Sequence, residues 1–351
     1  MKKILFILPH LNSGGAEKVT INFIRQLKKE KFDISLVVLK KTEQLLDLVP
    51  QNVKLVDLET KSTKKSFLKL TKYIKHNPQD VVFTSHSRLA FLVMLLKPFV
   101  KKFQHIARMQ SSPVLEKKYS EYSFIVRFLY MLGFRGADVV IAQTKQMKKE
   151  ALEVFKLNEY KVTVMNNPLD TINIDKLLRD ASSPFLEKEV NIVVSGRLRK
   201  EKGYDVLIKA LPVILKEIPN LKLYVLGSDN GEYNSLKTLM EKFGLENNII
   251  FLGFKKNPYI YYKYCDLFVL SSRREGFPNA LLENYYLNTP IVATRCVPIV
   301  SELIEDGVNG YTCDVDDINC LSEKIISCMQ NIKRKDIKNP EYMGSKLEEL
   351  F

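Results

Sequence analysis

Two glutamates with seven residues between them, Glu275 and Glu283, lie in the stretch SSRREGFPNALLE at residues 271–283. Glu275 follows an apolar run, and Pro278 stands where proline is favoured, at the first turn of a helix. Glu283 then lies a turn or more inside that helix. The two carboxylates are therefore expected at different depths, and each can accept hydrogen bonds without donating any.

The start of the same helix offers hydrogen-bond donors. The backbone amides of Asn279, Ala280 and Leu281 have no partner within a helix that begins here, so we expect them to be unsatisfied and ready for an anion or a hydroxyl group. An ordinary helix start is the alternative. Two carboxylates with a helix terminus between them suit a sugar nucleotide, which presents hexose hydroxyls, a diphosphate and ribose hydroxyls.

Two further segments follow apolar runs and could bind phosphate. Arg197 and Lys202 lie in RLRKEKG, and fixed cations at that place suit a diphosphate, although a solvated basic loop is equally consistent. Gly14 and Gly15 lie in NSGGAEK, where adjacent glycines before a helix let the backbone approach a phosphate. This segment is neither a dinucleotide fingerprint nor a Walker loop, so a structural turn is the alternative.

The elements that must position these residues follow the same alternation of strand and helix patterns in each half of the chain. Short apolar runs typical of buried parallel strands alternate with longer helical patterns. The first half contains KILFIL, DISLVVL, VKLVDL, DVVFTS, FQHIAR, DVVIAQ and KVTVM, and the second contains VNIVVSG, LKLYVLG, NIIFLG, DLFVLSS and PIVAT. This α/β pattern predicts two doubly wound parallel sheets, with a ligand between the domains at the carboxyl ends of the strands.

Composition places the chain among soluble proteins of two domains. It has 351 residues, of which 46% are hydrophobic, and no apolar window long enough to span a membrane. Its N-terminus is expected to be a first strand and not a signal peptide. The five cysteines form no C-x-x-C pair, which indicates reduced core thiols in a cytosolic protein.

Charge is unevenly distributed along the chain. Residues 1–168 hold 30 Lys and Arg against 14 Asp and Glu, a balance of +16, whereas residues 169–351 hold 24 against 26. An excess confined to one half suggests a surface that meets nucleic acid or an acidic membrane. A lysine-rich proteome is the alternative.

Read together, these segments resemble the family-four retaining glycosyltransferases. The resemblance rests on GGAEK, SGRLRKEKG, GFKKNPYIYYKYCDLFVLSSRREGFPNALLE and TPIVATRCVPIVSELIEDGVNGY, and covers nearly the whole chain. It implies the GT-B fold, in which two Rossmann-like domains face a central cleft. Residues 1–168 would form the acceptor-binding domain and residues 169–338 the donor-binding domain, with a C-terminal helix at about 339–351 that packs back on the first.

The resemblance also implies roles for individual residues. Glu275 would bind hydroxyls of the donor sugar and Glu283 those of the ribose, while Arg197 and Lys202 would neutralise the departing diphosphate. Arg197, Lys202 and Glu275 are thus the expected catalytic residues. The expected donor-binding set comprises Gly14, Gly15, Arg197, Lys202, Glu275, Gly276, Phe277, Pro278, Asn279, Ala280, Leu281 and Glu283.

The activity implied by the resemblance is transfer of a hexose or N-acetylhexosamine from a nucleotide sugar, by family preference a UDP-sugar. The implied acceptor is a polyprenyl-diphosphate-linked saccharide in the synthesis of capsule, O-antigen or exopolysaccharide. Configuration at the anomeric carbon would be retained without a protein nucleophile, and neither a cofactor nor a metal is expected. The enzyme would be cytoplasmic and peripheral on the inner face of the plasma membrane.

The chain departs from the family pattern at one place. Many relatives carry an active-site histidine where this chain has Arg108, Met109 and Gln110, so that role has no matching residue here. His86, after another apolar run, is the candidate for the acceptor side. His10 and His105 are expected to be structural and His76 exposed.

A possible metal motif lies near the end of the second domain. Asp314 and Asp316 form a D-x-D triplet in CDVDD. We expect it to be a turn and helix cap, far from the cleft, and not a metal site.

Two basic segments in the first domain could meet an anionic membrane. Residues 61–76 interleave six lysines with apolar residues, and Lys97, Lys101 and Lys102 follow the apolar run LAFLVMLL. Core packing is the alternative for the apolar residues. A nucleic-acid-binding protein is a competing interpretation, but aromatic residues do not form a stacking platform with these lysines. A nucleotide-sugar epimerase would need an acid and base cluster that is not evident.

Overall fold

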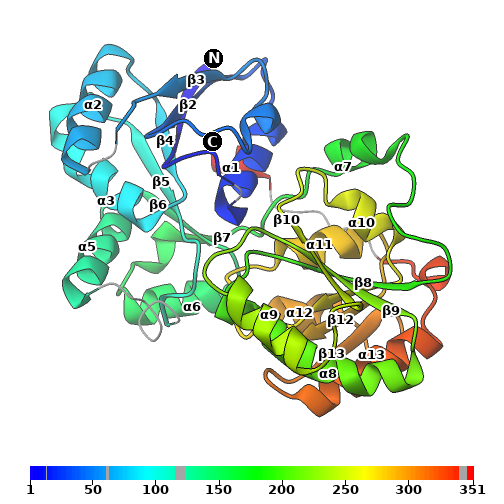
Figure 1. Cartoon of the computed structure of the whole chain (residues 1–351). Coiled ribbons are helices and arrows are strands. Elements are labelled where there is room, and N and C mark those ends of the chain that lie inside the picture. The colour runs from blue at the N-terminus through cyan, green and yellow to red at the C-terminus, as the bar shows by residue number, and fades with distance from the viewer. Residues whose placement is uncertain (13, 61–62, 115–122, 340–345) are drawn as a thin grey trace. The chain divides into compact units, whose positions relative to one another are not determined.

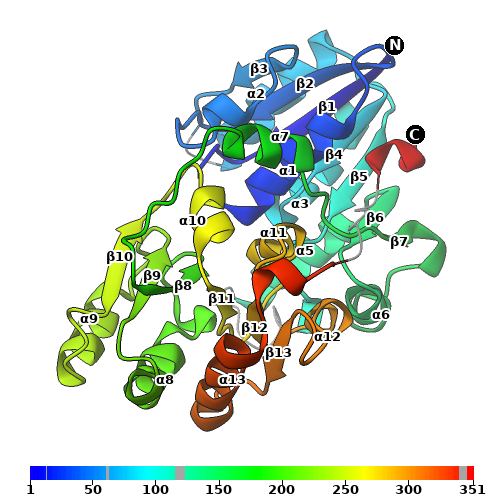
Figure 2. The ribbon, with the colours of Figure 1, turned by 90° about the vertical axis from the view of Figure 1, so that its right-hand side faces the viewer.

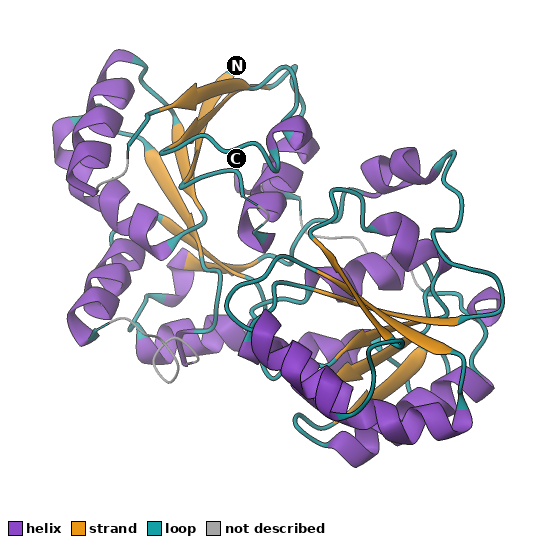
Figure 3. Cartoon of the chain, viewed as in Figure 1, coloured by secondary structure: helices purple, strands orange, loops and turns teal. Residues whose placement is uncertain are grey.

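The computed structural model describes residues 1–12, 14–60, 63–114, 123–339 and 346–351. The chain forms two compact units, and each is built on a parallel sheet of its own. The first unit consists of residues 1–169 and the end of the chain, and the second begins at Asp170. In each unit helices lie on both sides of the strands (Figures 1 and 3). The predicted fold class, two doubly wound parallel sheets, is confirmed.

All seven apolar runs of the first half are strands. They are β1 (Lys2–Leu8), β2 (Phe32–Val38), β3 (Lys54–Asp57), β4 (Val81–Thr84), β5 (Gln104–Arg108), β6 (Val139–Ala142) and β7 (Val162–Val164). The sheet has the order β3-β2-β1-β4-β5-β6-β7. Most of its residues are buried on both faces, because helices cover both faces of a parallel sheet.

The helices of the first unit divide between those two faces. They are α1 (Gly15–Gln26), α2 (Thr63–His76), α3 (Ser87–Leu96), α5 (Phe124–Arg135) and α6 (Lys145–Val154). Leu5 and Ile7 of β1 point into a core formed with α2 and α3. Phe6, between them, packs against Phe83 of β4, which in turn contacts Phe23 of α1. Alternation along β1 thus supplies both cores.

The second unit repeats the plan with six strands. They are β8 (Val190–Ser195), β9 (Leu221–Leu226), β10 (Ile249–Gly253), β11 (Leu267–Leu270), β12 (Ile291–Thr294) and β13 (Gly310–Cys313), in the order β10-β9-β8-β11-β12-β13. Strand β13 was not among the predicted runs. Its four residues, GYTC, begin with glycine and contain no continuous apolar run, so only pairing with β12 identifies it.

Helices again cover both faces of this sheet. They are α7 (Thr171–Leu178), α8 (Tyr204–Glu217), α9 (Tyr233–Lys242), α10 (Tyr259–Tyr264), α11 (Asn279–Tyr286), α12 (Pro298–Leu303) and α13 (Ile318–Asn331). Helices α8, α9 and α13 pack together on one face, and α10 and α11 lie on the other (Figure 2).

The strand orders determine where ligands bind. In a doubly wound sheet the crevice forms where the order reverses, outside the carboxyl ends of the two central strands. Those strands are β1 and β4 in the first unit, and β8 and β11 in the second. The loops after these four strands carry Gly14, His86, Arg197 and Glu275.

The C-terminal end of the chain contacts the first unit. Glu348 accepts a hydrogen bond from the amide of Lys28, and the Phe351 ring lies 5.4 Å from that of Phe32. A long helix was expected here. The described residues instead form a short 3-10 helix, Leu347–Leu350, and residues 340–345 of the expected helix lie outside the described part.

The five cysteines are free thiols, and Cys265, Cys313 and Cys328 are buried. The predicted core location is confirmed for these three, while Cys296 and Cys320 are half-buried. No helix within the described ranges is long and apolar enough to cross a membrane.

Candidate active site

The loops that follow β8 and β11 are joined at the carboxyl edge of the second sheet. The Lys202 ammonium lies 2.7 Å from Glu275 Oε1, and the Ser272 hydroxyl donates to the same oxygen at 2.7 Å. Ser271 donates to the backbone carbonyl of Lys202 at 2.9 Å. Gly203 has a φ of 65°, and a Cβ there would overlap the carbonyl of Ser271. Only glycine therefore permits the two loops to approach this closely.

The pairing of Lys202 with Glu275 combines two predicted functions at one place. The lysine was expected to contact a diphosphate and the glutamate a sugar. Their side chains are 22% and 11% exposed, so each is partly shielded from water and their charges compensate each other. Arg197 is exposed, and no hydrogen bond or ion pair joins it to any described residue. Its charge is therefore uncompensated by any described side chain.

Arg273, which sequence analysis left without a role, ties the loop of Glu275 to its neighbours. Its guanidinium binds Asp205 through two hydrogen bonds of 2.7 and 2.8 Å, and its Nε donates to Asp316 at 2.6 Å. It also donates to the carbonyl of Lys200. The hydrogen bonds to Asp205, outweighing the effect of burial, raise the pKa of Arg273. The arginine thereby fixes the loop two residues before Glu275.

Both aspartates of the D-x-D triplet form ion pairs with arginines. Asp314 binds Arg295 at 2.7 Å, and Asp316 binds Arg273 at 2.6 Å. The expectation that this triplet lies far from the site is wrong for Asp316. Strand β13 is separated from β11 only by β12, so the loops that leave β13 and β11 lie at neighbouring places on the same edge.

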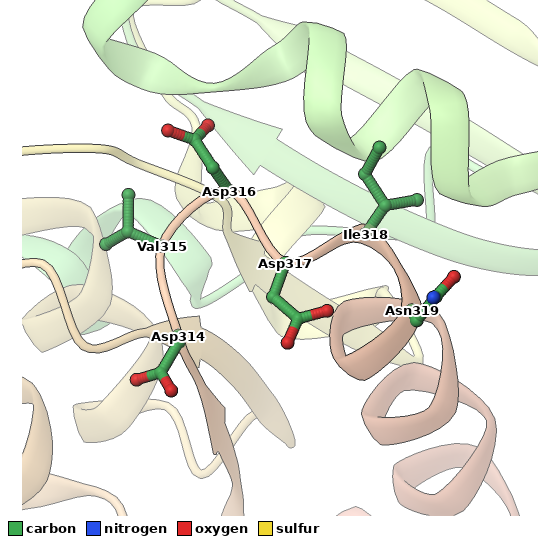
Figure 4. A pocket seen from close by; sticks show the side chains of 6 residues that line it. All are labelled: Asp314, Val315, Asp316, Asp317, Ile318 and Asn319. Carbon is green, nitrogen blue, oxygen red and sulfur yellow. The ribbon is translucent and has the colours of Figure 1, made fainter.

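The turn and cap interpretation of the triplet is supported by its geometry. The Asp317 carboxylate caps α13, and Asp316 has a φ of 64°, as in a tight turn. The side chains of Asp314 and Asp316 point in different directions from the loop that lines a pocket at residues 314–319 (Figure 4). Among the described residues no group of three or more His, Cys, Asp or Glu side chains could hold a metal ion.

The start of α11 differs from the expectation. The amide of Asn279 donates to the carbonyl of Phe277 at 3.0 Å, and that of Leu281 donates to the carbonyl of Pro278 at 3.0 Å. The prediction of unsatisfied amides is therefore wrong for these two residues. Tight turns around Pro278 use them internally, which leaves Ala280 as the remaining amide of the predicted set.

The other residues predicted to bind the donor differ in exposure. Phe277 is buried against α11 and α12, Pro278 is buried, and Gly276 is half-buried. Glu283 is 4% exposed, so its carboxyl group is almost covered. Its contact with a ribose stays a prediction.

In the first unit a buried glutamate joins the two loops at the reversal of strand order. Glu17, in the first turn of α1, is 4% exposed. Its Oε1 lies 3.2 Å from His86 Nε2 and 3.6 Å from His10 Nδ1. A Cβ on Gly14 would overlap the Glu17 carboxylate, so a larger residue at position 14 would displace this side chain. Gly15 is exposed, and its predicted contact with phosphate stays a prediction.

The histidines hold the Glu17 carboxylate in its charged form. Burial alone would raise the pKa of Glu17, but the hydrogen bond and charge of His86, together with the charge of His10, bring it below the ordinary value of 4.5. Glu17 was not among the predicted site residues, and His10 was expected to be structural. The one available signal was the position of Glu17, directly after the glycine pair in GGAEK.

The place of the missing family histidine is taken by a buried arginine. Arg108, at the end of β5, is 2% exposed, and its Nη2 donates to Asn167 at 2.5 Å. Burial lowers its pKa to about 9. His105 of the same strand is fully buried and bonded to Thr84, as expected of a structural residue. His76 is exposed, as predicted.

Comparison with known families matches both units. A family model described as glycosyl transferases group 1 matches residues 175–343, and one described as glycosyltransferase family 4 matches residues 13–172. Together the two models span nearly the whole chain.

Curated relatives and solved structures are similar over long stretches. The chain is 31% identical to an uncharacterized glycosyltransferase of Methanocaldococcus jannaschii over 65% of its own length and 58% of the relative's. It is 26% identical, over 97% of its length and 93% of the relative's, to N-acetylgalactosamine-N,N'-diacetylbacillosaminyl-diphospho-undecaprenol 4-alpha-N-acetylgalactosaminyltransferase of Campylobacter jejuni. The structure of Anabaena HepE in complex with UDP and glucose has a TM-score of 0.76 at 20% identity, covering 94% of this chain and 90% of HepE. That last likeness shows a shared GT-B fold.

Proposed function

Because the chain belongs to the group 1 and family 4 glycosyltransferases, we propose that it transfers a hexose or N-acetylhexosamine from a UDP-sugar to a lipid-linked saccharide with retention of configuration. The pathway we propose is the synthesis of a bacterial surface polysaccharide. The name of the C. jejuni relative supports a polyprenyl-linked acceptor, and the UDP and glucose bound to HepE support the donor.

The ion pair between Lys202 and Glu275 is the observation that carries this proposal. In a nucleotide sugar the hexose and the β-phosphate share one oxygen, so groups that bind them must lie side by side. A 2.7 Å pair at the reversal of strand order provides this arrangement. Glu275 accepts hydrogen bonds from sugar hydroxyls, and Lys202 faces the phosphate.

The chemistry follows from where charge develops. As the bond between the anomeric carbon and the β-phosphate oxygen breaks, negative charge grows on the phosphate. Lys202 and the uncompensated Arg197 stabilise that charge, and one well-placed donor of this kind contributes about 3 kcal/mol in other enzymes. The acceptor hydroxyl attacks the face from which the diphosphate departs, so no protein nucleophile is required. These cations make a metal or organic cofactor unnecessary in the proposed reaction.

We further propose that the basic first unit contacts an anionic membrane, on the cytoplasmic face where the acceptor would be bound. In α2 the apolar Leu70 and Ile74 are core residues, so core packing is the correct interpretation for them. Lys64 and Lys72 are exposed, and such a lysine near an anionic surface contributes about 1 kcal/mol. Lys97 instead binds the carbonyl of Gly136 and does not belong to this surface.

The alternatives have less support. No observation favours an epimerase, since both family models and the named relatives are glycosyltransferases. The family assignment likewise leaves nucleic-acid binding without support beyond the charge of the first unit. Formation of a glycosylated acceptor, as opposed to isomerisation of the free nucleotide sugar, distinguishes transfer from epimerisation.

Calorimetric titration with UDP and GDP tests the donor site. We expect micromolar UDP binding that weakens several-fold in Glu283→Gln, because the neutral amide is a poorer acceptor for ribose hydroxyls than the carboxylate. Glu246→Gln, an exposed change in the same unit, is the control and should bind UDP normally. Equal binding by Glu283→Gln and the wild-type protein would remove Glu283 from the site.

Radiolabelled UDP-sugars and undecaprenyl-diphosphate-linked N-acetylglucosamine then test transfer. A labelled lipid product that depends on Lys202 and Glu275 supports the proposed function. UDP binding without a labelled lipid product from any of the UDP-sugars tested would overturn the acceptor assignment.

A further inference from the structure

The hydrogen bonds that the described residues make to the Glu275 side chain all go to one of its two carboxylate oxygens. Oε1 accepts from the Lys202 ammonium and from the Ser272 hydroxyl, each at 2.7 Å. A carboxylate oxygen has two lone pairs, so these two donors saturate Oε1. Oε2 has no hydrogen-bond partner among the described residues and is not among the fully covered side-chain atoms. The carboxylate thus has one occupied oxygen and one that is open to a ligand.

Ser272 is the more rigid of the two donors to Oε1. It lies two residues after the end of β11 and is 1% exposed, so a ligand does not meet its hydroxyl in this structure. An ionised carboxylate can only accept, which means that the serine proton points at Oε1. The ammonium of Lys202 ends a long flexible side chain and can turn with the carboxylate. The buried hydroxyl therefore decides which oxygen of Glu275 is held.

A residue of the neighbouring strand fixes the backbone of Ser272. Thr294, the last residue of β12, is 1% exposed and lies beside the exit of β11 because these two strands are paired. Its hydroxyl lies 2.5 Å from the carbonyl of Ser272 and 3.2 Å from that of Leu270. A hydroxyl has a single proton, so the shorter contact takes the hydrogen bond. The end of β12 thus holds the loop from which the Ser272 hydroxyl reaches Glu275.

We propose that Ser272, supported by Thr294, is a positioning residue that makes Oε2 of Glu275 the oxygen that binds the donor sugar. A carboxylate with two free oxygens can bind two neighbouring hydroxyls side by side, whereas here every sugar contact of Glu275 must converge on Oε2. Neither hydroxyl touches the nucleotide, so their loss affects binding of the sugar and not of UDP. This inference rests on the proposed function, because it assumes that Glu275 faces the sugar.

Titration calorimetry with UDP and with UDP-glucose, UDP-galactose and their N-acetylamino forms tests the inference. The measured quantity is the Kd of the UDP-sugar that the wild-type protein binds most tightly, divided by the Kd of UDP. Ser272→Ala should raise this ratio about five-fold or more, as expected for the loss of one hydrogen bond, while the Kd of UDP stays within about two-fold. Ser322→Ala removes an equally buried hydroxyl, which donates to the carbonyl of Asn319, and should keep the wild-type ratio. A wild-type ratio in Ser272→Ala would overturn the inference.

Two variants of Thr294 test the support that it gives to Ser272. Thr294→Val keeps the shape of the side chain and removes the hydroxyl, so the same ratio of Kd values should rise. Thr294→Ser keeps the hydroxyl and should retain the wild-type ratio. Equal ratios in the two variants would overturn the role of Thr294.

Glu275→Gln separates the inference from the proposed function. If Glu275→Gln keeps the wild-type ratio, Glu275 does not face the sugar, and both fail. If it raises the ratio and Ser272→Ala does not, only the inference fails. Because Ser272 acts through Glu275, the double variant should match Glu275→Gln to within about two-fold. Additive effects of the two substitutions would mean that Ser272 acts on the sugar independently, which would overturn its assignment as a positioning residue.

Discussion

At the scale of single residues, the cations of the donor site differ in what surrounds them. Lys202 is paired with Glu275, whereas Arg197 is exposed and has no ion-pair partner among the described residues. Removal of the Arg197 side chain therefore leaves no carboxylate without an ion-pair partner. We expect Arg197→Gln to weaken UDP binding by roughly 10-fold or more, the loss of one charge-assisted hydrogen bond, with an unchanged melting temperature. Titration calorimetry and thermal melting measure the two quantities.

The control for Arg197 is Arg179→Gln, an exposed arginine in the same unit. It removes the same charge from the unit but not from the loop after β8, so UDP binding should be unaffected. Equal weakening by both substitutions would mean that overall charge, and not a contact at Arg197, controls binding.

At the scale of elements, the approach of two loops depends on one glycine. Gly203 combines a φ of 65° with a Cβ position that the carbonyl of Ser271 occupies. Gly244 has the same φ of 65°, but nothing lies within 4 Å of its Cβ position. Gly203→Ala should therefore destabilise the protein more than Gly244→Ala, which carries only a backbone cost of about 1 kcal/mol. Denaturant unfolding measures both.

Both variants carry the same backbone strain. The difference between their free energies of unfolding therefore measures the contact between the two loops. Because displacement of Ser271 also moves Glu275, Gly203→Ala should lose most of its UDP binding, whereas Gly244→Ala should retain it. Equal stabilities of the two variants would show that the loops separate without cost, against the arrangement described for this edge.

At the scale of the whole molecule, stability in acid should depend on a buried histidine of the first unit. Burial, followed by the charge of Lys97, lowers the pKa of His105 from 6.5 to about 3. Between these two pH values the unfolded chain binds a proton that the folded chain does not. The stability that comes with a neutral His105 is thus complete above pH 6.5 and is lost as the pH falls toward 3, by at most about 1.4 kcal/mol per pH unit.

Urea unfolding at a series of pH values checks this dependence. His105→Gln should unfold more easily at neutral pH and show a smaller decline between pH 6.5 and 4, because it has no imidazole to titrate. His76→Gln should keep the wild-type slope. If the free energy of unfolding falls with pH equally in His105→Gln and the wild-type protein, other groups cause the acid sensitivity.

The sequence by itself determined the elements of this protein and the family to which it belongs. Near-continuous apolar runs identify buried parallel strands locally, and twelve of the thirteen strands were predicted in this way. Strand β13 was missed because four residues with little apolar character carry no periodic signal. The segment from Glu275 to Glu283 identified the family, because its spacing lies within one loop and one helix.

Only the tertiary structure decided which of those residues meet. Lys202 and Glu275 are 73 residues apart, and the order of β8 and β11 in the sheet brings them within 2.7 Å. The same holds for Arg273 with Asp316 and for Glu17 with His86. Local patterns encode whether a segment is a strand or a helix, but strand order and side-chain rotamers depend on packing among distant segments. The ion pairs at both sheet edges therefore had to be read from the fold.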